Sequence, residues 1–217
     1  GALASLAPAV ADMAFMDVAE VTIAGAACVV SRSGYTGEDG YEISVASGQA
    51  VDLARALLAL DGVAAIGLGA RDSLRLEAGL CLYGNDIDAT TSPVEAALTW
   101  AIQKARRAGG DRAGGFPGAD RILDEMAHGA PRRRVGLLPE GRGPMREGTR
   151  LFAENSDTPV GIVTSGAFGP TLERPVSMGY VETAHAAVGS ALLGEVRGKL
   201  LPVSVAALPF RPAQFKR

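Results

Sequence analysis

The chain has 217 residues, a net charge of −3 and 47% hydrophobic residues, which predicts one or two folded domains rather than a disordered chain. No apolar run reaches the ~18 residues that span a bilayer, so we expect no membrane insertion, and the mildly acidic charge argues against general nucleic-acid binding. The two cysteines form no C-x-x-C motif, so the sequence indicates neither a zinc site nor a disulfide framework.

The first 60 residues have the pattern of half an α/β sandwich. Residues 20–23 and 27–31, joined at Ala24-Gly25, predict a β-hairpin. A glycine-rich loop at 33–40 and a third strand at 41–45 follow. A helix then begins at Ser47-Gly48 and ends at 61–62. This order is typical of a ferredoxin-like fold.

Residues 61–130 are predicted to be mostly helical. One helix is expected at 71–78 and another at 120–127, each ended by a glycine. Between them, Ser92, Pro93 and Glu95 form a capping-box pattern with proline at the first helical position. This pattern predicts a helix that runs from Ser92 through Trp100 and Ile102 to residue 107.

Beyond Arg132 the sequence breaks into six short β-type runs separated by turn residues, at 134–138, 149–152, 160–164, 176–181, 191–196 and 200–206. We therefore predict an α+β chain in three parts. These are half of a ferredoxin-like sandwich at 1–60, the mostly helical part at 61–130, and a small C-terminal antiparallel β-barrel at 131–217.

The loop at 33–40 is the first candidate site. Its glycines do not match a phosphate-binding spacing, and a strand rather than a helix follows it. Its side chains suggest a different ligand, because Tyr35 offers an aromatic face and Glu38, Asp39 and Glu42 offer carboxylates. A carboxylate can accept two donors side by side from an amino-pyrimidine edge, and a ring can lie on the tyrosine. The alternative is a tight structural loop.

Arg71 has two interpretations: a surface arginine paired with Asp72 or Glu77, or a guanidinium that binds a carboxylate or a ring carbonyl. Neither of the two histidines, His128 and His185, has a nearby Ser, Cys or acid arranged as a triad. We therefore predict neither a catalytic triad nor a metal site.

Long motifs of the chain resemble the aminomethyltransferase (T-protein) family of the glycine cleavage system. The matching runs are SRSGYTGEDGYEI at 31–43, ARDSLRLEAGLCLYGNDID at 70–88, TSPVEA at 91–96, PVGIVTSG at 159–166 and GYV at 179–181. They occur in the family's order and cover nearly the whole chain.

The resemblance implies a folate enzyme with a three-domain cloverleaf fold. Such an enzyme passes the one-carbon unit from the aminomethyl-lipoyl arm of H-protein to tetrahydrofolate and releases ammonia. It implies that Glu42 binds the pterin, that Arg71 binds folate and that Tyr35 lines the same pocket. Near the C-terminus, Phe215 aligns with a folate-contacting tyrosine of the family.

One departure from the family concerns length. Family chains begin with a segment that has no match here and that carries the aspartate thought essential for catalysis. We therefore expect a C-terminal fragment without catalytic residues of its own, inactive alone in aminomethyl transfer.

Two alternatives stay open at this point. One is the folate-binding tail of a sarcosine or dimethylglycine dehydrogenase or of a related demethylase, and the other is a non-catalytic module that binds folate or a protein. We also expect a reducing, bacterial cytoplasm. The two lone cysteines and the lack of a signal-peptide pattern indicate the cytoplasm, and 18 Arg against 3 Lys, with abundant Ala and Gly, indicates a bacterial genome.

Overall fold

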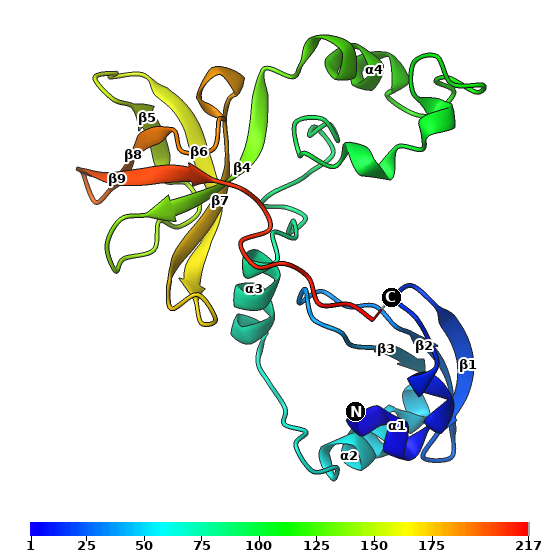
Figure 1. The fold of residues 1–217 in the computed structure, drawn as a ribbon. Helices are drawn as coiled ribbons and strands as arrows, with labels where there is room; N and C mark the ends of the chain where they lie inside the picture. The colour runs from blue at the N-terminus through cyan, green and yellow to red at the C-terminus, as the bar shows by residue number, and fades with distance from the viewer. Residues whose placement is uncertain (217) are drawn as a thin grey trace. The chain divides into compact units, whose positions relative to one another are not determined.

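Two units make up residues 1–216, the part of the chain that the computed structural model describes (Figure 1). The N-terminal unit holds Gly1–Arg75 together with the C-terminal residues from Pro212 onward, and the barrel unit holds Leu76–Arg211. Among the helices of the described residues, none combines the length and apolarity that crossing a bilayer requires.

The α-helices are α1 (Ala2–Leu6), α2 (Ala50–Leu58), α3 (Leu68–Glu77) and α4 (Ala119–His128). Short 3₁₀ helices lie at η1 (Pro8–Ala11), η2 (Ser47–Gln49), η3 (Thr99–Ala101), η4 (Lys104–Arg106) and η5 (Thr183–His185). The strands are β1 (Val18–Ile23), β2 (Ala26–Ser31), β3 (Glu42–Val45), β4 (Arg132–Pro139), β5 (Arg150–Ala153), β6 (Pro159–Gly169), β7 (Arg174–Glu182), β8 (Ala191–Val196) and β9 (Lys199–Ala206).

An antiparallel sheet of order β1-β2-β3 forms the N-terminal unit. Ala24 and Gly25 both have positive φ, as the two-residue turn of a tight hairpin requires, so the predicted hairpin is confirmed. On β2, Ala26, Cys28 and Val30 are buried and alternate with exposed residues. They pack with residues of α1, η1 and α2, which cover one face of the sheet (Figure 1). The helices and sheet thus form half of a sandwich.

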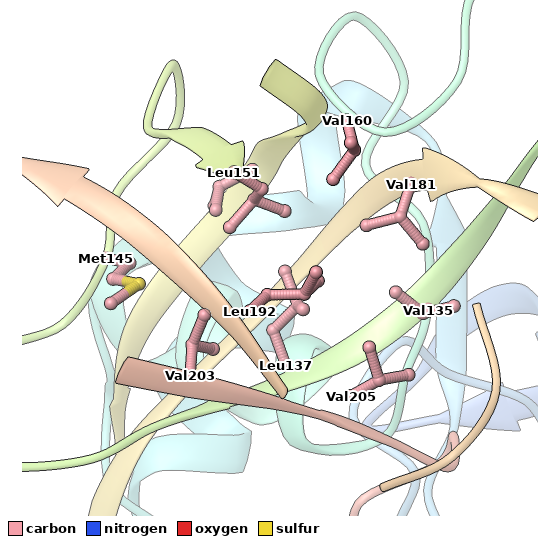
Figure 2. Packing of buried hydrophobic residues seen from close by; sticks show 10 residues of the cluster. Val135, Leu137, Met145, Leu151, Val160, Val181, Leu192, Val203 and Val205 are labelled. Atoms are coloured by element: carbon pink, nitrogen blue, oxygen red, sulfur yellow. The ribbon is translucent and has the colours of Figure 1, made fainter. Parts of the chain in front are cut away.

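A closed antiparallel barrel of order β4-β7-β6-β5-β8-β9 forms most of the barrel unit. All six predicted strands are present, and the predicted α+β class with a C-terminal barrel is confirmed. Aliphatic side chains from all six strands fill its interior, as Figure 2 shows for the core residues Val135, Leu137, Met145, Leu151, Val160, Val181, Leu192, Val203 and Val205. The division into three parts at residues 60 and 130 stays a prediction of the sequence.

Gly166 on β6 allows a very close approach of another segment. A Cβ atom at this position would lie 1.7 Å from the carbonyl oxygen of Met145. That carbonyl is held in place, because Ser177 Oγ donates a hydrogen bond to it at 2.7 Å.

Replacing Gly166 by alanine is therefore expected to lower the free energy of unfolding of the barrel unit by about 2 kcal/mol or more, because the backbone has to shift. Urea unfolding followed by far-UV circular dichroism measures the loss. Gly143 is the matched control, since nothing lies within 4 Å of a Cβ placed there. Equal stability of the two alanine variants would contradict the packing at Gly166.

The long helix predicted from Ser92 to residue 107 is wrong: residues 93–97 form turns, and only the short 3₁₀ helices η3 and η4 follow. The capping box itself forms: Ser92 Oγ accepts a hydrogen bond from the Glu95 N–H at 3.0 Å, and Glu95 Oε2 accepts one from the Ser92 N–H at 2.9 Å. The turn ends at Ala97, where φ is +56° and a helix cannot continue. Arg134 explains the stop, because its N–H donates to the Glu95 carbonyl at 2.7 Å and its Nε to the Ala96 carbonyl at 2.9 Å. These carbonyls would otherwise accept the next helical hydrogen bonds.

Glu95 is buried and joins this turn to α4 and β4. Its carboxylate accepts hydrogen bonds from Arg132 Nε at 2.8 Å and from Arg121 Nη2 at 2.9 Å. Burial raises the pKa of the Glu95 carboxyl, but the hydrogen bonds from Arg132 and from the Ser92 backbone outweigh it, and the net pKa lies below its usual range.

Because the pKa of Glu95 is lower in the folded than in the unfolded state, its stabilising contribution is complete above the unfolded value of about 4.3 and is lost as the pH falls through the folded value. We expect Glu95→Gln to cost about 2 kcal/mol at pH 7, below the ~3–5 kcal/mol of a fully buried ion pair, since both arginines are half-exposed. The difference in free energy of unfolding between the variant and wild type should disappear at acid pH, where Glu95 is protonated. Urea unfolding between pH 7 and pH 3 measures it, with exposed Glu154→Gln as control. A gap that stays constant with pH would contradict this account.

Candidate functional site

The loop between β2 and β3 ends at Glu42, the first residue of β3, which pairs with Ser31 of β2. The Glu42 side chain is exposed, and its Oε2 accepts a hydrogen bond from Ser33 Oγ at 2.9 Å. Ser33 Oγ lies 2.8 Å from Ser31 Oγ, so the two hydroxyls form a short chain that leads to the carboxylate. One oxygen of Glu42 is thus oriented by the loop, and within residues 1–216 the structure shows no hydrogen bond to the other. The group can still accept from a ligand.

Arg71 lies on α3 with its guanidinium carbon 4.6 Å from the centroid of the Tyr35 ring, a cation–π contact. The two acids of the surface-pairing interpretation are engaged elsewhere. Asp72 binds Arg75 at 2.7 Å, and Glu77 Oε1 accepts hydrogen bonds from the N–H groups of residues 171 and 172. The guanidinium of Arg71 is thus oriented by an aromatic ring, and its role in binding a ligand stays a prediction.

Asp39, one of the loop's acids, has a structural contact. Arg32 binds both of its oxygens, with Nε at 2.9 Å and Nη2 at 2.5 Å. The hydrogen bond from Arg32 is the main cause that holds the pKa of the Asp39 carboxyl below its usual range. Arg32 is itself buried and donates to the Met13 carbonyl at 2.7 Å. The predicted cluster of carboxylates is thus divided between a bound Asp39 and an open Glu42.

Phe215 lies on the C-terminal segment that belongs to the N-terminal unit. Its ring stacks on that of Phe15, with centroids 4.0 Å apart and planes 6° from parallel. The structure therefore brings Tyr35 and Arg71 into contact, places Glu42 at the end of the loop that carries Tyr35, and pairs Phe215 with another aromatic ring. The predicted roles of these four residues in folate binding stay predictions.

Two residues of this region were missed from the sequence. Arg32 lies within the 31–43 run and Phe15 lies in no motif; the roles of both were missed because their partners come from a loop and from the far end of the chain. The low aromatic content of 5% was the one signal that could have marked Phe15. Among the described residues, no group of three or more His, Cys, Asp or Glu side chains could hold a metal ion.

Two family models match the chain. The family model described as GCVT N-terminal domain matches residues 2–106, and the one described as Glycine cleavage T-protein C-terminal barrel domain matches residues 132–211. Together they account for most of the chain.

Curated relatives extend the match. The mitochondrial aminomethyltransferase of Dictyostelium discoideum is 44% identical over 215 residues, which cover 96% of this chain and 52% of the relative. That of Gallus gallus is 48% identical over 204 residues, 94% of this chain and 50% of the relative. The crystal structure of glycine cleavage system aminomethyltransferase T from Bartonella henselae aligns with a TM-score of 0.87 at 45% identity, over 95% of this chain and 55% of that one. The chain spans about half the length of these proteins.

Proposed function

Because this chain belongs to the glycine cleavage T-protein family, we propose that it forms the tetrahydrofolate-binding part of an aminomethyltransferase. The complete reaction transfers the one-carbon unit of aminomethyl-lipoyl H-protein to tetrahydrofolate and releases ammonia. Both the reaction and the two substrates belong to the proposal, since the chain covers about half of its relatives.

The observation that carries the proposal is the arrangement of the 33–41 loop. An open carboxylate at Glu42 stands at its end, and the Tyr35 ring within it supports the guanidinium of Arg71 at 4.6 Å. In this proposal Glu42 accepts two hydrogen bonds from the amino-pyrimidine edge of the pterin. Arg71 binds a carboxylate or carbonyl oxygen of the folate, and Tyr35 keeps it in place.

Lipoylated H-protein is the proposed protein partner, and the bacterial cytoplasm is the proposed compartment. The family of the relatives supports the partner. The arginine-rich composition supports the compartment, and so do Cys28 and Cys81, which form no disulfide in the described part of the chain.

Equilibrium binding of tetrahydrofolate to the purified chain tests the proposal. Saturable one-to-one binding that inorganic phosphate and free glutamate do not displace is expected. Binding of aminomethylated H-protein, measured in parallel, separates an aminomethyltransferase from a folate-binding dehydrogenase tail. A chain that binds neither ligand would contradict the proposal.

A further inference from the structure

Residues 212–216, which we call the tail, pair directly with the 33–41 loop, the part of the chain that leads from β2 to β3. Gln214 forms a parallel β-bridge with Glu38, and its N–H donates to the Gly37 carbonyl at 3.0 Å. The described residues 33–41 contain no helix and no strand. Much of the order of this loop therefore comes from a segment about 175 residues away in sequence.

The tail is in turn held by the segment that precedes β1. The Phe215 ring stacks on Phe15 at 4.0 Å, and the Phe15 N–H donates to the Lys216 carbonyl at 2.7 Å. Lys216 Nζ also donates to the Ala11 carbonyl. The ring stack adds an apolar contact to these hydrogen bonds. An aromatic pair stabilises a fold by about 0.5–1.5 kcal/mol beyond the effect of its buried area.

Arg32 joins the 33–41 loop to the segment that precedes β1. It binds Asp39 in the loop and the Met13 carbonyl in the segment before β1, and its backbone carbonyl accepts from the Met16 N–H at 3.0 Å. Loop, tail and pre-strand segment thus meet in one hydrogen-bonded group. Tyr35 and Glu42 lie at either side of the part of the loop that the tail binds.

We propose that the Phe15–Phe215 stack is a clamp that positions the 33–41 loop for the folate ring, so that Phe215 is a positioning residue that acts through Phe15. The inference rests on the proposed function for its ligand, tetrahydrofolate. It assigns to Phe215 a role that a phenyl ring can fill without donating a hydrogen bond. It also assigns a role to Phe15, which no motif marks.

Amide hydrogen exchange without any ligand tests the clamp. In Phe15→Ala, in Phe215→Ala and in a chain that ends at Arg211, exchange in residues 33–41 is expected to rise roughly tenfold, while the β1–β2 hairpin keeps its wild-type protection. Phe215→Tyr preserves the stack, so exchange in residues 33–41 of this variant should stay at the wild-type rate. Phe168→Ala, which removes a half-exposed ring from β6 of the barrel unit, is the matched control and should leave the loop unchanged. Unchanged loop exchange in both stack variants, or an equal rise in the loop and the hairpin, would overturn the clamp.

Tetrahydrofolate affinity separates positioning from direct contact. Phe15→Ala and Phe215→Ala should weaken binding by the same factor, roughly tenfold, and the double variant should be no weaker than either single one. A loss of affinity in Phe215→Ala with wild-type affinity in Phe15→Ala would overturn the proposal in favour of direct contact between Phe215 and folate. A wild-type chain that does not bind tetrahydrofolate would contradict the proposed function, and the ligand-free exchange pattern would still decide the clamp.

Discussion

Replacing Glu42 by glutamine is expected to weaken tetrahydrofolate binding roughly 10- to 100-fold, because hydrogen bonds to a charged partner are the strong ones. The carboxylate presents two acceptors, one of them oriented by Ser33. Glutamine keeps the shape of the side chain but turns one acceptor into a donor that would face the amino group of the pterin. Isothermal titration of wild type and variant measures the change.

Glu20→Gln is the matched control for this variant. Glu20 is an exposed glutamate on β1 of the same sheet, so its loss changes the net charge of the unit equally. We expect wild-type affinity for the control. Equal weakening by the two substitutions would mean that charge alone matters, and wild-type affinity of Glu42→Gln would remove Glu42 from the site.

Asp86→Ala is expected to give the largest loss of stability, about 3–5 kcal/mol in the barrel unit, because buried donors lose their acceptor. Asp86 is 1% exposed. Its carboxylate accepts hydrogen bonds from Thr164 Oγ1 at 2.5 Å, from Ser165 Oγ at 2.8 Å and from the Leu82 N–H at 2.8 Å. Its carbonyl oxygen also accepts from the Tyr180 hydroxyl at 2.7 Å. Urea unfolding followed by far-UV circular dichroism measures the loss.

Asp86→Asn should lie between wild type and alanine, since one side-chain acceptor remains. Asp88→Ala is the matched control. Asp88 lies two residues after Asp86, is exposed, and accepts hydrogen bonds from the Thr90 and Thr91 hydroxyls, so its loss should change the free energy of unfolding little. If Asp86→Ala and Asp88→Ala unfold at the same urea concentration, the buried network does not stabilise the barrel unit as described.

Local patterns were enough to predict most of the helices and strands. The alternation along β1 and β2 and the Ala24-Gly25 turn depend on neighbours in sequence, and so do the short runs of the barrel. The helix expected from Ser92 failed for a non-local reason. Its capping box forms as the sequence predicts, but Arg134 of β4 takes the carbonyls that would have continued the helix.

The candidate site could be predicted as a set of residues but not as an arrangement. Tyr35, Glu42 and Arg71 stand in recognisable motifs, whereas the contact between Tyr35 and Arg71 depends on how α3 returns to the loop. The stack of Phe15 on Phe215 joins opposite ends of the chain, and the pairing of Asp39 with Arg32 requires the loop to fold back. No periodicity encodes such contacts, because they are settled by tertiary packing.

The central claim is that the 33–41 loop and Arg71 bind the folate ring, and a crystal structure of the chain with bound tetrahydrofolate tests it most directly. We predict that the amino-pyrimidine edge of the pterin lies within hydrogen-bond distance, about 2.7–3.2 Å, of the Glu42 carboxylate. The Arg71 guanidinium should stay on the Tyr35 ring and reach an oxygen of the ligand. A pterin bound elsewhere on the chain, with Glu42 facing solvent, would contradict the account.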